Sequence, residues 1–63
     1  MNIETAQSFL GKKCTINFRD SYGDDVTLNL RVREVISAPL YGSFVIGDIY
    51  DVNLEMVMSI YPS

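Results

Sequence analysis

The stretch VNLEMVMSI, residues 52–60, decides between a mainly β and a mixed fold. Read as a strand, it places five apolar residues on one face: Val52, Leu54, Met56, Met58 and Ile60. Val57 then lies on the outward face, and a following Tyr61 shares that face. Read as a helix, the stretch places Asn53 within an apolar arc, although Leu, Glu and Met favour helix locally. The alternation is longer than the helical stripe, so the sequence predicts a final strand over about 52–61.

Before this stretch, two runs alternate in the same way. KCTINFR (13–19) and VTLNLRVR (26–33) each place apolar residues at every second position, and DSYGDD (20–25) between them is dense in turn formers. They predict a hairpin over about 13–33. One register sets Phe18 opposite Val26 and Lys13 opposite Arg31, while a slip by two sets Lys13 opposite Arg33.

The N-terminal segment has the signals of a short helix. Asn2 can cap the first amides, Glu4 lies in the first turn, and Gly11 follows the last periodic residue. We expect a helix over about 2–10, docked on the sheet because an isolated helix of this length is marginal in water.

The middle of the chain interrupts the alternation. A bulge within REVIS (33–37) restores the pattern and bends the strand. SAPLYGS (37–43) predicts a loop, and FVI (44–46) predicts a short buried strand, followed by a turn at Gly47–Asp48 or Tyr50–Asp51.

These elements predict a mainly β fold in one domain of residues 1–63. A short N-terminal helix precedes four or five antiparallel strands, which form a strongly bent sheet or close into a small barrel.

Three segments of this pattern resemble the SH3-like and Sm-like small barrels. LGKKCTINFRD (10–20) is similar to the Sm-type opening, YGSFVIGD (41–48) to a central strand, and VNLEMVMSI to the closing strand. The glycine of the bent second strand and the Asp and Asn that contact a base in Sm-type RNA binders are absent here. The resemblance therefore implies a fold and carries over no site residue.

Composition excludes several chemistries. The chain has 63 residues, a net charge of −3, one cysteine and no histidine. An imidazole-based triad and a thiolate or imidazole zinc site are thereby excluded, and we expect no enzyme, no metal and no cofactor. The N-terminus lacks the order of a signal peptide and no apolar run reaches membrane-spanning length, so we expect a cytoplasmic protein that contacts no membrane.

Basic and aromatic residues supply the candidate binding positions. The hairpin places Lys13, Arg19, Arg31 and Arg33 on its outward face, and Tyr22 and Tyr41 lie at loop tips. Val57 and Tyr61, predicted to face outward from the last strand, are candidates for self-association.

We therefore expect a non-catalytic binding module that acts through protein–protein contact, as a homo-oligomer or as a subunit of a complex. The alternative is a nucleic-acid-binding small barrel that uses the basic outer face of the 13–33 hairpin.

Overall fold

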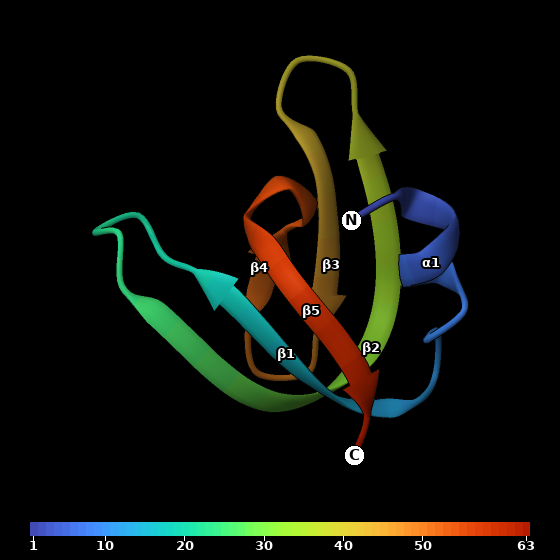
Figure 1. Ribbon diagram of the computed structural model, residues 1–63. Coiled ribbons are helices and arrows are strands. Elements are labelled where there is room, and N and C mark those ends of the chain that lie inside the picture. The colour runs from blue at the N-terminus through green and yellow to red at the C-terminus, as the bar shows by residue number, and fades with distance from the viewer.

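The longest element, β2 (Asp25–Ala38), pairs with a different neighbour along each half. In the computed structural model, which describes residues 1–63, β1 (Lys13–Arg19) pairs with residues 25–31 and β3 (Gly42–Gly47) with residues 32–38. β4 (Asp51–Asn53) extends the sheet beside β3, and β5 (Val57–Pro62) extends it beside β1 (Figure 1). The sheet has five antiparallel strands in the order β4-β3-β2-β1-β5.

The predicted mainly β class with one short helix is confirmed, but the barrel does not close. β4 and β5 are the two edges of the sheet, and no ladder joins them. β4 spans only 3 residues, so it offers too little backbone to complete a ring of strands. Of the two expected forms, the open bent sheet is the one that the chain adopts.

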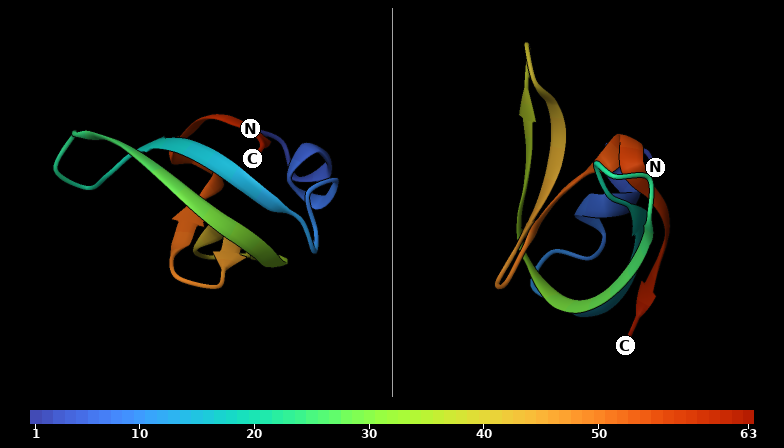
Figure 2. Two further views of the ribbon diagram at one scale, coloured as in Figure 1. Left: turned by 90° about the horizontal axis from the view of Figure 1, so that it is seen from below. Right: turned by 90° about the vertical axis from the view of Figure 1, so that its left-hand side faces the viewer.

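The bend comes from the bulge predicted within residues 33–37. Val32 pairs with Gly47 and Glu34 pairs with Ile46, so Arg33 is the additional residue on β2. A bulge increases local twist and curves its strand, and β2 accordingly curls around the interior of the molecule (Figure 2).

The loop predicted over 37–43 is largely wrong. β2 continues to Ala38 and β3 begins at Gly42, which are paired, so only Pro39–Tyr41 turn the chain. Gly42 has φ +92°, a conformation that glycine adopts without strain, and this permits the short turn. The expected strand at 44–46 is correct but forms only the later part of β3.

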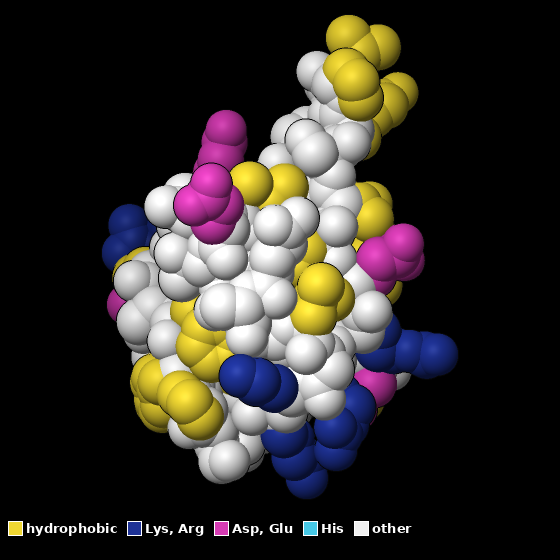
Figure 3. All heavy atoms as spheres, turned by 90° about the vertical axis from the view of Figure 1, so that its right-hand side faces the viewer, with side chains coloured by type: hydrophobic (Ala, Val, Ile, Leu, Met, Phe, Trp, Pro, Cys, Tyr) yellow, Lys and Arg dark blue, Asp and Glu magenta, His cyan; other side chains and the backbone are white.

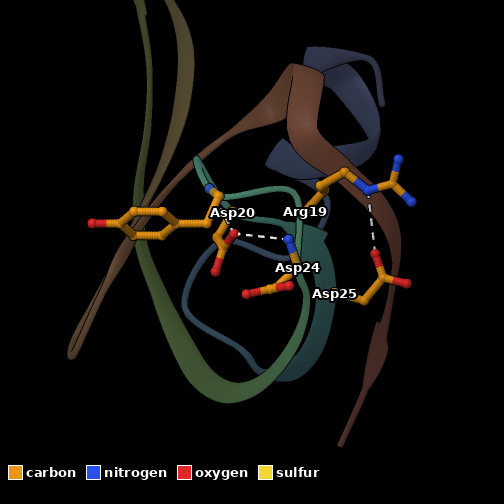
Figure 4. A network of polar contacts seen from close by, with 5 residues as sticks. Arg19, Asp20, Asp24 and Asp25 are labelled. Atoms are coloured by element: carbon orange, nitrogen blue, oxygen red, sulfur yellow. Dashed lines mark hydrogen bonds and ion pairs between the residues drawn. The ribbon is translucent and has the colours of Figure 1, made fainter.

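The predicted 13–33 hairpin has the first of the two registers. Phe18 pairs with Val26 and Lys13 with Arg31, so the alternative slip by two is wrong. Its loop is fixed by the Asp20 carboxylate, which accepts hydrogen bonds from the backbone N–H groups of Tyr22 (2.9 Å) and Asp24 (3.0 Å; Figure 4). The acidic loop therefore serves turn geometry.

The helix α1 (Ile3–Gln7) is shorter than the predicted 2–10. Asn2 is its N-cap, because the Asn2 side chain accepts a hydrogen bond from Thr5 N–H at 2.8 Å. Residues 8–11 continue as turns, and Gly11 reverses the chain at φ +77°. α1 buries Ala6 completely against the sheet.

The single strand predicted over 52–61 is wrong. Residues 54–56 form a 3₁₀ helix, η1 (Leu54–Met56), between β4 and β5. The Asn53 side chain accepts a hydrogen bond from Glu55 N–H at 2.9 Å and thereby caps the helical turn. The local helix preference of Leu, Glu and Met thus prevails over the alternation for three residues.

A second irregularity reverses the predicted faces of the last strand. Asn17 pairs with Ser59 and Phe18 with Val57, which leaves Met58 as the additional residue. Val57 is therefore buried at 8% exposure, whereas Met58 is 52% exposed.

The core lies inside the curve of the sheet. Its ten buried residues are Ala6, Cys14, Ile16, Phe18, Leu30, Val32, Val45, Val52, Leu54 and Val57.

The only α-helix, α1, is too short to span a bilayer, and no helical segment meets the length and hydropathy of a membrane span.

The reversed faces of β5 give a direct stability test. Val57→Lys should abolish folding or lower the free energy of unfolding by several kcal/mol, because it buries an unpaired charge. Met58→Lys, one residue further, should change that free energy by about 0.5 kcal/mol or less. Urea unfolding of both variants measures the difference, and equal losses would contradict the bulge at Met58.

Candidate functional site

Four basic residues gather where α1 leads into β1. Lys13 pairs with Arg31 across the hairpin, while the backbone of Lys12 accepts a hydrogen bond from Val32 N–H at 3.0 Å, between Arg31 and Arg33. All four of these cationic residues are exposed. We call Lys12, Lys13, Arg31 and Arg33 the basic cluster; Figure 3 shows Lys and Arg side chains gathered at the end of the molecule away from the β2–β3 turn.

The basic cluster has no carboxylate partner within ion-pair distance, since Arg19–Asp25 is the one ion pair of the molecule. Arg31 instead donates to the Gly11 carbonyl at 2.8 Å. The Asp48 carboxylate contacts the backbone of Arg31, because it accepts a hydrogen bond from the Arg31 backbone N–H at 3.0 Å. Four cations therefore remain available at one end of an acidic protein.

The other predicted binding residues lie elsewhere. Arg19 is at the far end of β1, about 20 Å along the strand from Lys13 at 3.3 Å per residue, and its guanidinium pairs with Asp25 at 3.3 Å (Figure 4). Tyr22 (90% exposed) and Tyr41 (75% exposed) stand in the turns of two different hairpins. The structure thus divides the predicted set and adds Lys12, which sequence analysis omitted.

The predicted self-association pair is not a shared surface. Val57 is buried opposite Phe18, so the predicted outward orientation of Val57 is wrong. The bulge at Met58 reverses the faces of the strand. Tyr61 is half-exposed and pairs with Thr15 on the outer face of the sheet.

That outer face is a polar network. Thr27 Oγ1 donates to Asn17 Oδ1 at 2.6 Å, and Asn17 Nδ2 donates to Ser59 Oγ at 2.7 Å, which links β2, β1 and β5. Thr15 Oγ1 donates to Asn29 Oδ1 at 2.6 Å in the next row. Because these groups satisfy one another, the network stabilises the sheet and offers few free groups to a ligand.

The outer part of the β2–β3 hairpin projects beyond the rest of the molecule (Figure 1). We call residues 34–44 the arm. From Val35 to Gly47 the sequence carries no charged residue, and apolar side chains cover the tip of the projection in Figure 3. Leu40 (88%) and Tyr41 (75%) are exposed there. The predicted loop over 37–43 falls within the arm, so the arm was missed, although its lack of charge was a visible signal.

A hollow of about 280 Å³ opens where the end of β1 faces β4. The rings of Phe18 and Tyr50 meet in it at a centroid distance of 5.6 Å. Its lining comprises Phe18, Arg19, Asp20, Ser21, Tyr50, Asp51, Val52, Asn53 and Met56. This mixture of aromatic, amide and carboxylate groups suits contact with a polypeptide segment and contains no nucleophile paired with a base.

The lone thiol is part of the core. Cys14 is completely buried, and its pKa is raised by that burial and by the negative charge of Asp48. The neutral thiol is therefore favoured, which opposes nucleophilic reactivity. No group of three His, Cys, Asp or Glu side chains gathers as a metal site.

Comparisons with family models, with curated proteins and with solved structures found no match to this chain.

Burial of Cys14 predicts a protected thiol. In the folded protein at neutral pH, Cys14 should react with an aromatic disulfide reagent orders of magnitude more slowly than in urea. Tyr22→Cys provides an exposed thiol as the control and should react at once. The pKa of Cys14 in the folded protein lies above its value in the unfolded chain. The contribution of this thiol to the free energy of unfolding is therefore fully present below about pH 9 and should decline as the pH rises further. The decline should be smaller in Cys14→Val. Rapid reaction of native Cys14 would contradict the packing.

Proposed function

We propose that this chain is a non-catalytic binding module that acts through protein–protein contact, as a homo-oligomer or as a subunit of a complex. The observation that carries this proposal is the arm, a projection that carries no charge beyond Glu34 at its base and whose tip exposes Leu40 and Tyr41. Exposed aromatic and aliphatic side chains grouped on a projecting element are typical of contact surfaces between proteins.

The chemistry of the chain supports a non-catalytic role. There is no histidine to act as a base, and the only thiol is buried in its neutral form. The proposal includes a cytoplasmic location, because a free thiol persists in a reducing compartment. It also includes kinship with the SH3-like or Sm-like small barrels at the level of fold, supported by the short helix that leads into a bent antiparallel sheet.

The arm tip supplies the test. The tagged native protein is cross-linked chemically in cell extract, and the proteins that become attached to it are identified; a second copy of the chain counts as a partner. A Leu40→Ser/Tyr41→Ser variant should lose these partners. Tyr22→Ser, which alters an equally exposed tyrosine in the other hairpin turn, should keep them. Circular dichroism checks that both variants fold. An unchanged set of cross-linked partners in the double variant would overturn the role of the arm.

The basic cluster favours a second candidate function, binding of nucleic acid. Its cations have no carboxylate partners. Contacts between Lys or Arg side chains and backbone phosphates account for most of the non-specific affinity of proteins for nucleic acid. The net charge of −3 opposes this candidate, which is why it ranks second.

This alternative makes its own prediction. Arg33→Glu should weaken binding to a single-stranded oligonucleotide and lower the slope of log affinity against log salt by about 1. Arg19→Glu makes the same charge change at the far end of β1 and should have a smaller effect. Fluorescence anisotropy at several salt concentrations measures both. No binding by the native protein at low salt would eliminate this candidate.

A further inference from the structure

The arm has an open backbone edge along β2. Residues 34–38 pair only with β3, since β1 pairs with β2 no further than Arg31 and the last backbone hydrogen bonds on that side join Gly11 and Lys12 to Val32. On the other strand, β4 reaches β3 only as far as Phe44. Beyond Val32 on β2 and Phe44 on β3, the arm is two-stranded. Two-stranded hairpins are marginally stable in water without a further partner.

The other edges of the sheet carry the features that prevent strand addition. β4 is only 3 residues long and begins with Asp51. β5 is interrupted at Met58 by a bulge and ends at Pro62, which has no N–H to donate. The β2 edge of the arm lacks such protection beyond Glu34 at its base: it is regular from Glu34 to Ala38, and Pro39 lies beyond the strand in the turn.

One face of the arm is apolar beyond Glu34, which lies on the same face at the base of the arm. Ile36 pairs with Phe44, and Glu34 pairs with Ile46, so Ile36, Phe44 and Ile46 lie on the face opposite to the buried Val45. Ile36 is 36% exposed and the other two are half-buried. An occupant of the arm must therefore offer an uncharged strand edge and apolar side chains.

We infer that this occupant is a second copy of the chain, with the two arms paired antiparallel along their β2 edges about a two-fold axis at Ile36. The inference rests on the proposed function and names its partner. A second copy supplies the required surface, because its residues 35–44 also carry no charge and its β2 edge is equally open. Antiparallel pairing of a strand with its own copy is self-complementary about a two-fold axis.

Charge selects the position of the axis. With Ile36 at the axis, residues 34–38 of both copies overlap and each Glu34 lies opposite Ala38 of the other copy. An axis at Glu34 would place the two Glu34 carboxylates opposite each other, which is unfavourable. An axis nearer the body would include the bulge at Arg33, where the strand is irregular.

The size of the arm fits a dimer of modest affinity. A standard interface buries about 800 Å² per partner, about a fifth of the 4187 Å² surface of this chain. The proposed pairing joins residues 34–38, five of the 63 residues, along one strand edge, so it engages less than a standard interface and predicts a weak dimer. The net charge of −3 on each copy opposes association of the remaining surfaces and leaves residues 35–44, which carry no charge, as the favoured contact.

Sedimentation equilibrium over a range of concentrations tests the dimer. The native protein should dimerise, and Ile36→Lys, which brings two like charges together at the axis, should raise the dissociation constant by about tenfold or more. Ile49→Lys makes the same substitution at an exposed position outside the arm and should leave the constant nearly unchanged. Equal effects of the two variants, or a native monomer at all concentrations, would overturn the inference.

A cysteine placed at the axis tests the register. Directly opposite residues on paired strands have Cβ atoms about 4.5–5.5 Å apart, close to the disulfide range of about 3.5–4.5 Å. Since Cys14 is buried, Ile36→Cys introduces the one accessible thiol and should form a covalent dimer on mild oxidation. Tyr22→Cys should form it much more slowly. Equal rates would contradict the proposed axis.

These outcomes also separate the inference from the proposed function. A monomer that still cross-links to other proteins through Leu40 and Tyr41 would keep the binding module and overturn the second copy. A monomer that instead co-sediments with phosphatidylcholine vesicles would overturn both, and so would a monomer that binds neither protein nor lipid.

Discussion

The exchange of partners along β2 determines the rest of the structure. At Val32 the strand leaves β1 and continues with β3, and Gly47 lies directly opposite at this crossing. A Cβ on Gly47 would lie 2.7 Å from the Tyr50 carbonyl oxygen and 3.0 Å from a Leu30 methyl carbon, so the chain can turn this tightly between β3 and β4 because glycine has no side chain. The Gly47 N–H also donates to that carbonyl at 3.0 Å, which closes the turn into β4.

This crossing divides β2 into two halves with different roles. The half that ends at Val32 places Leu30 and Val32 in the core and is covered on its outer face by hydrogen-bonded polar side chains. The half after it contributes Val35 beside the buried Val45 and then leaves the core as the arm. A small domain buries a limited share of its surface, and this one extends part of its longest strand away from its own core. That arrangement is the reason for seeking the function in contact with another chain.

Strict alternation and turn chemistry predicted the first hairpin and limited its pairing to two registers, because two clean period-2 patterns and an Asp-rich loop leave little freedom; the structure has the first of the two. The bulge near Arg33 was also predictable from the slip in phase. The end of the chain was not, because two irregularities there imitate continued alternation. The 3₁₀ turn at Leu54–Met56 and the bulge at Met58 together shift the buried residue from Met58 to Val57. The candidate site was predicted in part. Lys13, Arg31 and Arg33 are neighbours through strand pairing, whereas Arg19 is separated from them by the length of β1.

Amide hydrogen exchange, measured as a function of protein concentration, tests the central claim that the arm depends on a partner that the body of the sheet does not need. Residues 34–38 should exchange rapidly in dilute protein and become protected as the concentration rises, while the β1 amides from Cys14 to Phe18 stay protected throughout. Protection of residues 34–38 that is independent of concentration, and equal to that of β1, would contradict the account.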